Sequence, residues 1–136
     1  MKNEYLDIYE KAKEARLNAY TPYSNFKVGA CLKTKDNKYF IGFNIENASY
    51  SLCMCAERNA IYNAYINGVK KEDIESLCIC ADTIDVVSPC GACRQVMAEL
   101  LDENCTIVLA NIKGKMEEYT VKDLLPYFFK GSDMNV

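Results

Sequence analysis

The chain has 136 residues, half of them apolar, and carries a formal net charge of −3 at pH 7. This length suits one domain that buries about two thirds of its unfolded surface, so we expect residues 1–136 to form a single domain. The acidic balance and the scattered Lys and Arg residues argue against nucleic acid as a partner, and no apolar run approaches membrane-spanning length.

The N-terminal segment predicts a helix, because Ile8, Ala12, Ala15 and Ala19 recur at helical spacing. This helix should end before Pro22, since the residue that precedes a proline disfavours helix. A hairpin is expected next. Alternating apolar residues over 28–32 predict one strand, a turn is expected at 35–37, and a second strand should run over 39–43.

The rest of the chain predicts helices and strands in alternation. Apolar residues at helical spacing follow both Cys55 and Cys93 and predict two helices, the first of which should stop at Gly68. Strands are expected over 76–81, 106–110 and 116–119, and Thr120 should cap a last helix. The order αββαβαββα predicts an α/β fold of three layers, in which a mixed five-stranded sheet carries helices on both faces.

The N-terminus also bears on location, because it interleaves charged and apolar residues and lacks the hydrophobic core of a secretory signal. We therefore expect a cytoplasmic protein. A reducing compartment keeps cysteines as thiols or metal ligands, so the eight cysteines are not expected to form disulfides.

The segments Cys55-Ala56-Glu57 and Pro89-Cys90-Gly91-Ala92-Cys93 combine residue types that bind a metal. The chain has no histidine, so thiolates or carboxylates must be the ligands. Cys90 and Cys93 lie three residues apart, and at a helix start both sulfurs can face one ion. With Cys55 as the third ligand, one corner of a zinc tetrahedron is left for water, which is typical of catalytic zinc. Glu57 is then the expected base.

Both motifs precede predicted helices, whose first turns carry unpaired N–H groups and partial positive charge. This environment favours the thiolate that a metal needs. Three thiolates make a divalent site net negative, which weakens the acidification of bound water. Arg58 and Arg94 adjoin the motifs, and we expect Arg58 to offset the excess charge.

These motifs, extended by Arg94 and Gln95, resemble the signature of the zinc-dependent cytidine deaminases of the small homotetrameric type with three cysteine ligands. The resemblance continues through residues 21–26, 44–47 and 124–129. It implies one zinc ion per subunit and hydrolytic deamination of cytidine and deoxycytidine to uridine, or deoxyuridine, and ammonia. In this scheme water activated by zinc attacks C4 of the pyrimidine, and Glu57 moves the protons.

The resemblance also implies the substrate contacts. Asn44 and Glu46 would bind the ribose hydroxyls, Phe26 would line the nucleoside pocket, and the backbone of Ala56 would contact the base. Phe129 would reach the base from a neighbouring subunit of a homotetramer, so that the active sites are shared. The implied partner is a small-molecule nucleoside.

Plainer interpretations apply to several residues. Cys31, Cys78, Cys80 and Cys105 lie in strand-like runs, or beside one, and are expected to be buried apolar residues. Cys53 could also ligate in principle, but the family pattern selects Cys55 and leaves Cys53 as a neighbour in the pocket wall. A closed structural zinc site or a redox Cys-x-x-Cys pair is the alternative for the ligand cysteines.

Two rival functions follow from these alternatives. The first is deamination of another aminopyrimidine compound, as in the blasticidin S deaminases, which share Cys-Ala-Glu and Pro-Cys-Gly-x-Cys-Arg-Gln. The run Asn44-Ile45-Glu46-Asn47 looks like the nucleoside enzymes instead. The second rival is a non-catalytic zinc or redox module, which leaves Glu57 without a role.

Overall fold

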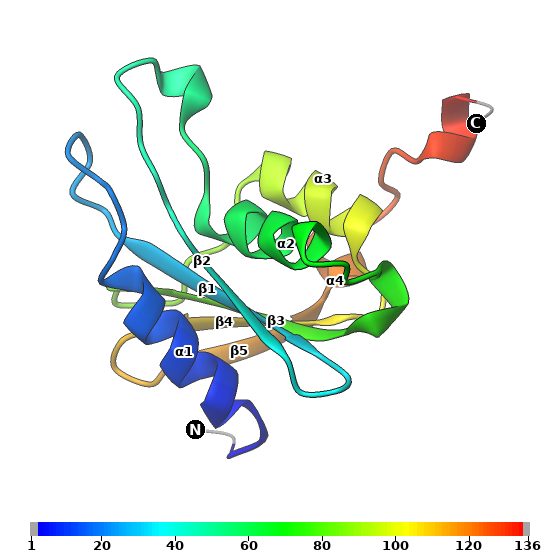
Figure 1. The fold of residues 1–136 in the computed structure, drawn as a ribbon, viewed down its shortest axis with the longest axis horizontal. Coiled ribbons are helices and arrows are strands. Elements are labelled where there is room, and N and C mark those ends of the chain that lie inside the picture. Colours follow the sequence, from blue (N-terminus) through cyan, green and yellow to red (C-terminus); the bar gives the residue numbers. More distant parts are fainter. Residues whose placement is uncertain (1–2, 135–136) are drawn as a thin grey trace.

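A five-stranded sheet lies between two layers of helices in the computed structural model, which describes residues 3–134 (Figure 1). The strand order is β2-β1-β3-β4-β5, with β3 and β4 parallel and the other neighbours antiparallel. The predicted mixed sheet is therefore confirmed. The strands are β1 Val28–Thr34, β2 Tyr39–Phe43, β3 Ile74–Ala81, β4 Thr106–Asn111 and β5 Met116–Thr120.

Helix α1 (Leu6–Arg16) covers one face of the sheet, and α2 (Ala56–Ile66) and α3 (Gly91–Leu100) cover the other (Figure 1). Successive strand residues face opposite layers because side chains alternate along a strand. Cys31 and Cys78 accordingly pack toward α1, whereas Leu32 and Leu77 join the core beneath α2 and α3. This division confirms the three-layer α/β architecture.

The helix boundaries follow local signals. Thr120 caps α4 (Val121–Leu124) by accepting from the backbone N–H of Asp123, and Asp123 accepts from the N–H of Thr120 in return. The first helix ends at Arg16, before the predicted apolar position Ala19, which lies in the turn that follows. Short 3-10 helices complete the described elements: Asn3–Tyr5, Tyr50–Leu52, Lys71–Asp73 and Gly131–Met134.

The cysteines of the sheet are packing residues, as predicted. Cys31, Cys78 and Cys80 are fully buried, and Cys105 is 5% exposed. Burial raises the pKa of Cys31 to about 12 and that of Cys80 to about 11, which keeps both thiols protonated and unreactive at neutral pH.

Two segments project from the layered body (Figure 1). Residues 44–54 form a long loop that carries the exposed side chain of Tyr50, and the C-terminal residues 125–134 extend away from α3. Tyr127 on that segment is fully exposed. No helix within residues 3–134 combines the length and the apolar character needed to cross a membrane.

Candidate metal centre and active site

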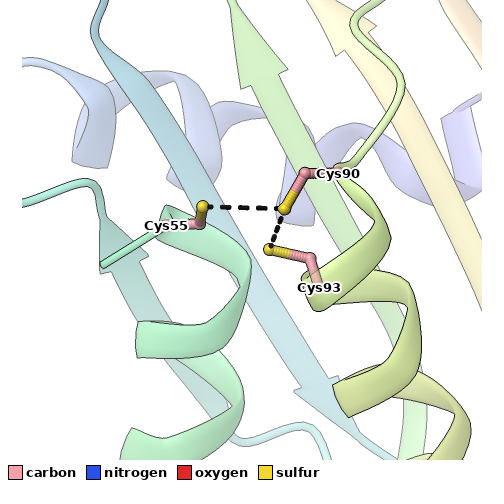
Figure 2. A group of neighbouring side chains, drawn as sticks. All are labelled: Cys55, Cys90 and Cys93. Carbon is pink, nitrogen blue, oxygen red and sulfur yellow. Dashed lines mark hydrogen bonds between the residues drawn. The ribbon is translucent and has the colours of Figure 1, made fainter. Parts of the chain in front are cut away.

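The start of α2 and the start of α3 lie next to each other on one face of the sheet, and the two helices bring three cysteines together (Figure 2). Cys55 is the N-cap residue of α2, and Cys90 is the N-cap residue of α3. Cys93 lies in the first turn of α3. Neither N-cap thiol makes a capping hydrogen bond with a backbone N–H of its own helix, so both sulfurs can face the space between the helices.

The spacing of the three sulfurs fits a single zinc ion. Three thiolates at tetrahedral positions about 2.3 Å from one ion lie about 3.8 Å apart. The Cys55 and Cys90 sulfurs are 4.0 Å apart, those of Cys90 and Cys93 are 3.4 Å apart, and all three lie within 4.8 Å of one another. The donor set can therefore close around one zinc ion with small side-chain shifts.

Arg58 lies beside this cluster. Its Nη2 lies 3.3 Å from the Cys55 sulfur. The hydrogen bond from Cys93, followed by the hydrogen bond and charge of Arg58, lowers the pKa of Cys55 to about 5. The Cys93 thiol donates this hydrogen bond, and its own pKa is raised for the same reason. Cys55 is thus prepared to be a thiolate at neutral pH.

Replacing Arg58 with Gln should weaken zinc binding, because the change removes the cation that stabilises the Cys55 thiolate. Changes to the partners of metal ligands cost roughly 10–100-fold in metal affinity or activity, and we expect a loss in that range. Competition with a chromogenic chelator measures it. Arg58→Lys keeps the charge and should recover part of the affinity, whereas wild-type affinity in Arg58→Gln would remove Arg58 from this role.

Glu57 lies one residue into the first turn of α2 and is 5% exposed. Burial is the main cause of its raised pKa, and the nearby Cys55 sulfur raises it further. A carboxyl with a raised pKa can both accept and return a proton near neutral pH. Glu57 therefore has the environment of a proton carrier and not that of a surface charge.

Glu57 opens onto a cavity of about 220 Å³ that also reaches the sulfurs of Cys55 and Cys90. Its wall is largely apolar, and three of the residues predicted to contact substrate belong to it. The lining residues are Phe26, Val28, Asn44, Cys55, Ala56, Glu57, Ile79, Val87, Ser88 and Cys90. Two of the clustered cysteines, the buried carboxyl of Glu57 and a largely apolar wall thus border one cavity.

Asn44 holds the edge of this cavity in place. Its side-chain oxygen accepts from the Val28 N–H at 2.9 Å, and its amide nitrogen donates to the Phe26 carbonyl at 2.8 Å. An amide has two donor hydrogens and two acceptor lone pairs, so half of its hydrogen-bonding capacity remains for a ligand.

Glu46 and Phe129, also predicted to contact substrate, lie outside the residues that line the cavity. Glu46 accepts from the backbone N–H groups of Tyr23 and Ser24 at 3.0 and 3.1 Å and from the Ser24 hydroxyl, and the last bond is the main cause of its lowered pKa. It therefore holds the loop that precedes Phe26. Phe129 is 56% exposed, and its carbonyl accepts from the Gln95 side chain at 2.9 Å.

The prediction that Cys53 belongs to the pocket wall is wrong for the cavity described here. Its sulfur instead packs against the Asn47 backbone, 3.3 Å from the nitrogen and 3.6 Å from the carbonyl oxygen. Met54, between the two cysteines, pairs with Ile45 in an antiparallel bridge, which sets the path of the chain at Cys53.

Several functional contacts had no clear signal in the sequence. Arg94 donates to the Pro89 carbonyl at 2.8 Å, to the Leu124 carbonyl at 2.7 Å and to the Ser88 hydroxyl, so it anchors the loop that carries Cys90. Its guanidinium is thus committed to that loop, which explains why Arg58 and not Arg94 serves the thiolates. Val87 and Ser88, which also line the cavity, could have been predicted only from their position directly before Pro89-Cys90 in the chain.

The chain matches a family model and several known proteins over most of its length. The family model for the cytidine and deoxycytidylate deaminase zinc-binding region matches residues 2–109. Cytidine deaminases of Halalkalibacterium halodurans and Sporosarcina psychrophila are 48% and 46% identical to the chain over 128 residues, which is 94% of the chain and 96% and 93% of those proteins.

Solved structures agree with the sequence comparison. A cytidine deaminase from Burkholderia pseudomallei superposes with a TM-score of 0.89 at 46% identity, covering 95% of this chain and 100% of that one. A cytidine deaminase from Mycobacterium tuberculosis superposes with a TM-score of 0.80 at 30% identity, covering 95% of this chain and 99% of that one.

Proposed function

The chain belongs to the cytidine deaminase family, and on that premise we propose that Cys55, Cys90 and Cys93 hold its zinc ion while Glu57 carries the protons of the reaction. The activity is zinc-dependent deamination of cytidine, and the three-cysteine site fits one zinc ion per subunit. The observation that carries the residue assignment is the cluster of three sulfurs, two of whose cysteines line the same cavity as the buried carboxyl of Glu57.

The reaction replaces the amino group at C4 of the pyrimidine with oxygen from water and releases ammonia. The thiolates of Cys55, Cys90 and Cys93 would hold the zinc ion, and the bound metal would supply Lewis acidity that lowers the pKa of water toward neutrality. Glu57 would accept a proton from that water and donate it to N3 of the ring. It would then take the remaining proton from the oxygen newly bonded to C4, which becomes the carbonyl of the product, and deliver it to the departing amino group as the C4–N bond breaks. Its burial keeps bulk water from exchanging these protons, and Arg58 limits the negative charge of the site.

The cavity wall suggests how a nucleoside is held. Phe26 offers an aromatic surface, and the Ala56 backbone lies beside Glu57, where an amide or carbonyl can meet the base. The unused donor and acceptor of Asn44 suit a ribose hydroxyl. Glu46 has one remaining lone-pair direction for the same purpose. Deoxycytidine, which keeps the 3′-hydroxyl, is proposed as a second substrate.

We propose that residues 1–136 form one catalytic domain that assembles as a homotetramer with shared active sites. The exposed side chain of Phe129 supports this proposal, because its ring does not line the cavity of its own subunit and is left open to a neighbouring one. All eight cysteines are free thiols, which suits a reducing cytoplasm. The net charge of −3 suits an uncharged nucleoside and not a nucleic acid or a membrane surface.

A subunit-crossing Phe129 predicts complementation between two defective variants. Phe129→Ala should lower kcat/KM roughly ten-fold without loss of zinc, since an aromatic contact contributes about 0.5–1.5 kcal/mol. Co-expression with Glu57→Gln should then restore activity, because one subunit contributes Glu57 and its neighbour contributes Phe129. Activity of the mixed oligomers that equals the average of the two parents would show that Phe129 serves only its own subunit.

One experiment tests the proposed function as a whole. Zinc content and cytidine turnover are measured on the same preparation, with blasticidin S as the competing substrate. We expect one zinc ion per subunit and turnover of cytidine. Turnover of blasticidin S alone would establish the rival deaminase, and stoichiometric zinc with no turnover of either compound would establish a non-catalytic module.

A further inference from the structure

Helix α2 packs closely against the sheet at Gly42, the next-to-last residue of β2. A Cβ atom built on Gly42 would lie 2.4 Å from the Ala56 carbonyl oxygen and 2.3 Å from the Ala60 backbone nitrogen. These atoms belong to helix backbone, so no rotation of a side chain relieves the overlap. The φ angle of Gly42 lies outside the left-handed region, so the position requires glycine for space and not for conformation.

Two asparagines of α2 donate hydrogen bonds to β2 on either side of Gly42. Asn59 donates its side-chain N–H to the Phe43 carbonyl at 2.8 Å, and Asn63 donates to the Ile41 carbonyl at 3.3 Å. Strand β2 is an edge of the sheet, so its outward carbonyls have no strand partner. The two amides fix α2 along its axis, while Gly42 sets how closely it packs.

The contact between Gly42 and α2 lies beneath the beginning of the helix. The atom nearest to Gly42 on that turn is the Ala56 carbonyl, between Cys55 and Glu57 in the chain. Cys90 and Cys93 come from α3, whose main contacts are with α2 and α4 and not with β2. The Cys55 sulfur comes from the start of α2 (Figure 2), so its distance to the other two sulfurs depends on where α2 lies on β2.

We propose that Gly42, with Asn59, is a positioning residue for the metal centre: the close approach at Gly42 brings the Cys55 sulfur and the Glu57 carboxyl into register with Cys90 and Cys93. The inference rests on the proposed function of those four residues. Gly42→Ala should push the first turn of α2 outward, and a displacement of about 1 Å in a catalytic group can cost roughly 10²-fold in rate.

The chain contains a matched control on the opposite face of the sheet. Gly29 lies under α1, where a Cβ would come within 2.0 Å of the Ala12 carbonyl oxygen and 2.5 Å of the Arg16 nitrogen. The steric conflict is of the same kind, yet α1 carries none of the proposed site residues. Gly29→Ala should therefore cost stability comparable to Gly42→Ala, without altering the metal centre.

The experiment compares both variants with the wild type as folded, metal-loaded protein. We expect Gly42→Ala to lower kcat about 10²-fold with a small change in KM, and to alter the thiolate-to-metal absorption of the cobalt-substituted protein. Gly29→Ala should match the wild type in kcat and in the cobalt spectrum. Equal kcat and equal spectra in the two variants would overturn the proposal. Wild-type zinc content and turnover, measured alongside, report separately on the proposed function.

A second pair keeps the test decisive if Gly42→Ala does not fold. Asn59→Ala removes the hydrogen bond to the Phe43 carbonyl without introducing a steric conflict. We expect this variant to have a kcat about ten-fold lower than the wild type and a shifted cobalt spectrum. Asn67→Ala is the control, because that amide, at the far end of the helix, donates to the carbonyl and side-chain oxygens of Asn63 and leaves the Asn63 nitrogen that bonds to β2 in place. Wild-type kcat and spectrum in Asn59→Ala would contradict the positioning role.

Discussion

Glu57→Gln is expected to abolish turnover of cytidine while leaving zinc bound at one ion per subunit. The amide has the shape of the carboxyl but cannot take a proton, and Glu57 is the only residue proposed to carry protons in this site. General acid–base catalysis contributes typically 10²–10⁴-fold, and because one group serves several proton transfers, we expect a loss of kcat near the upper end, roughly 10⁴-fold. Steady-state kinetics and metal analysis of one preparation measure both quantities.

The control for this variant is Glu99→Gln, which makes the same change of charge at an exposed position of α3. It should retain wild-type kinetics and zinc. Loss of zinc from Glu57→Gln would mean that the carboxyl holds the metal and does not carry protons. A kcat within ten-fold of the wild type would remove Glu57 from the reaction altogether.

Cys90→Ala is expected to lose both zinc and activity. Structural zinc sites contribute about 10–16 kcal/mol, so one of three protein ligands accounts for roughly 3–5 kcal/mol, or about 10²–10⁴-fold in affinity. The remaining two thiolates also leave the ion in an incomplete and misplaced coordination shell. We expect substoichiometric zinc after dialysis, residual turnover near background, and a lower thermal midpoint because bound zinc stabilises the folded state.

Cys53→Ala is the matched control for the metal site, because Cys53 lies two residues before Cys55 yet directs its sulfur at the Asn47 backbone. Zinc content in this variant should equal that of the wild type. Zinc retained at full stoichiometry in Cys90→Ala but lost from Cys53→Ala would reverse the assignment of ligands.

Some features of the site could be predicted because they are local in the chain. Cys90 and Cys93 share the first turn of one helix, and Glu57 follows Cys55 by two residues, so each pair is set by helix geometry alone. The order of helices and strands is equally local, since hydrophobic period and turn residues act over a few positions. These predictions agree with the structure to within a few residues at most element ends.

Other features depend on contacts between distant segments. Arg58 and Arg94 adjoin the motifs in the same way, yet only Arg58 reaches a thiol, because Arg94 is bound to the Pro89 and Leu124 carbonyls. Cys53 lies outside the pocket wall because the Ile45–Met54 bridge sets the path of its loop. Neither outcome has a periodic or compositional signal.

The amino-acid sequence by itself determined the α/β order of elements and indicated the types of metal ligand and the candidate proton carrier, since these follow from residue chemistry and short-range spacing. Only the tertiary structure decided how the beginnings of α2 and α3 meet, which arginine serves the thiolates, and why β2 carries glycine at position 42. The physical reason is that the depth and axial position of a helix on a sheet depend on backbone contacts between segments that the local pattern does not relate.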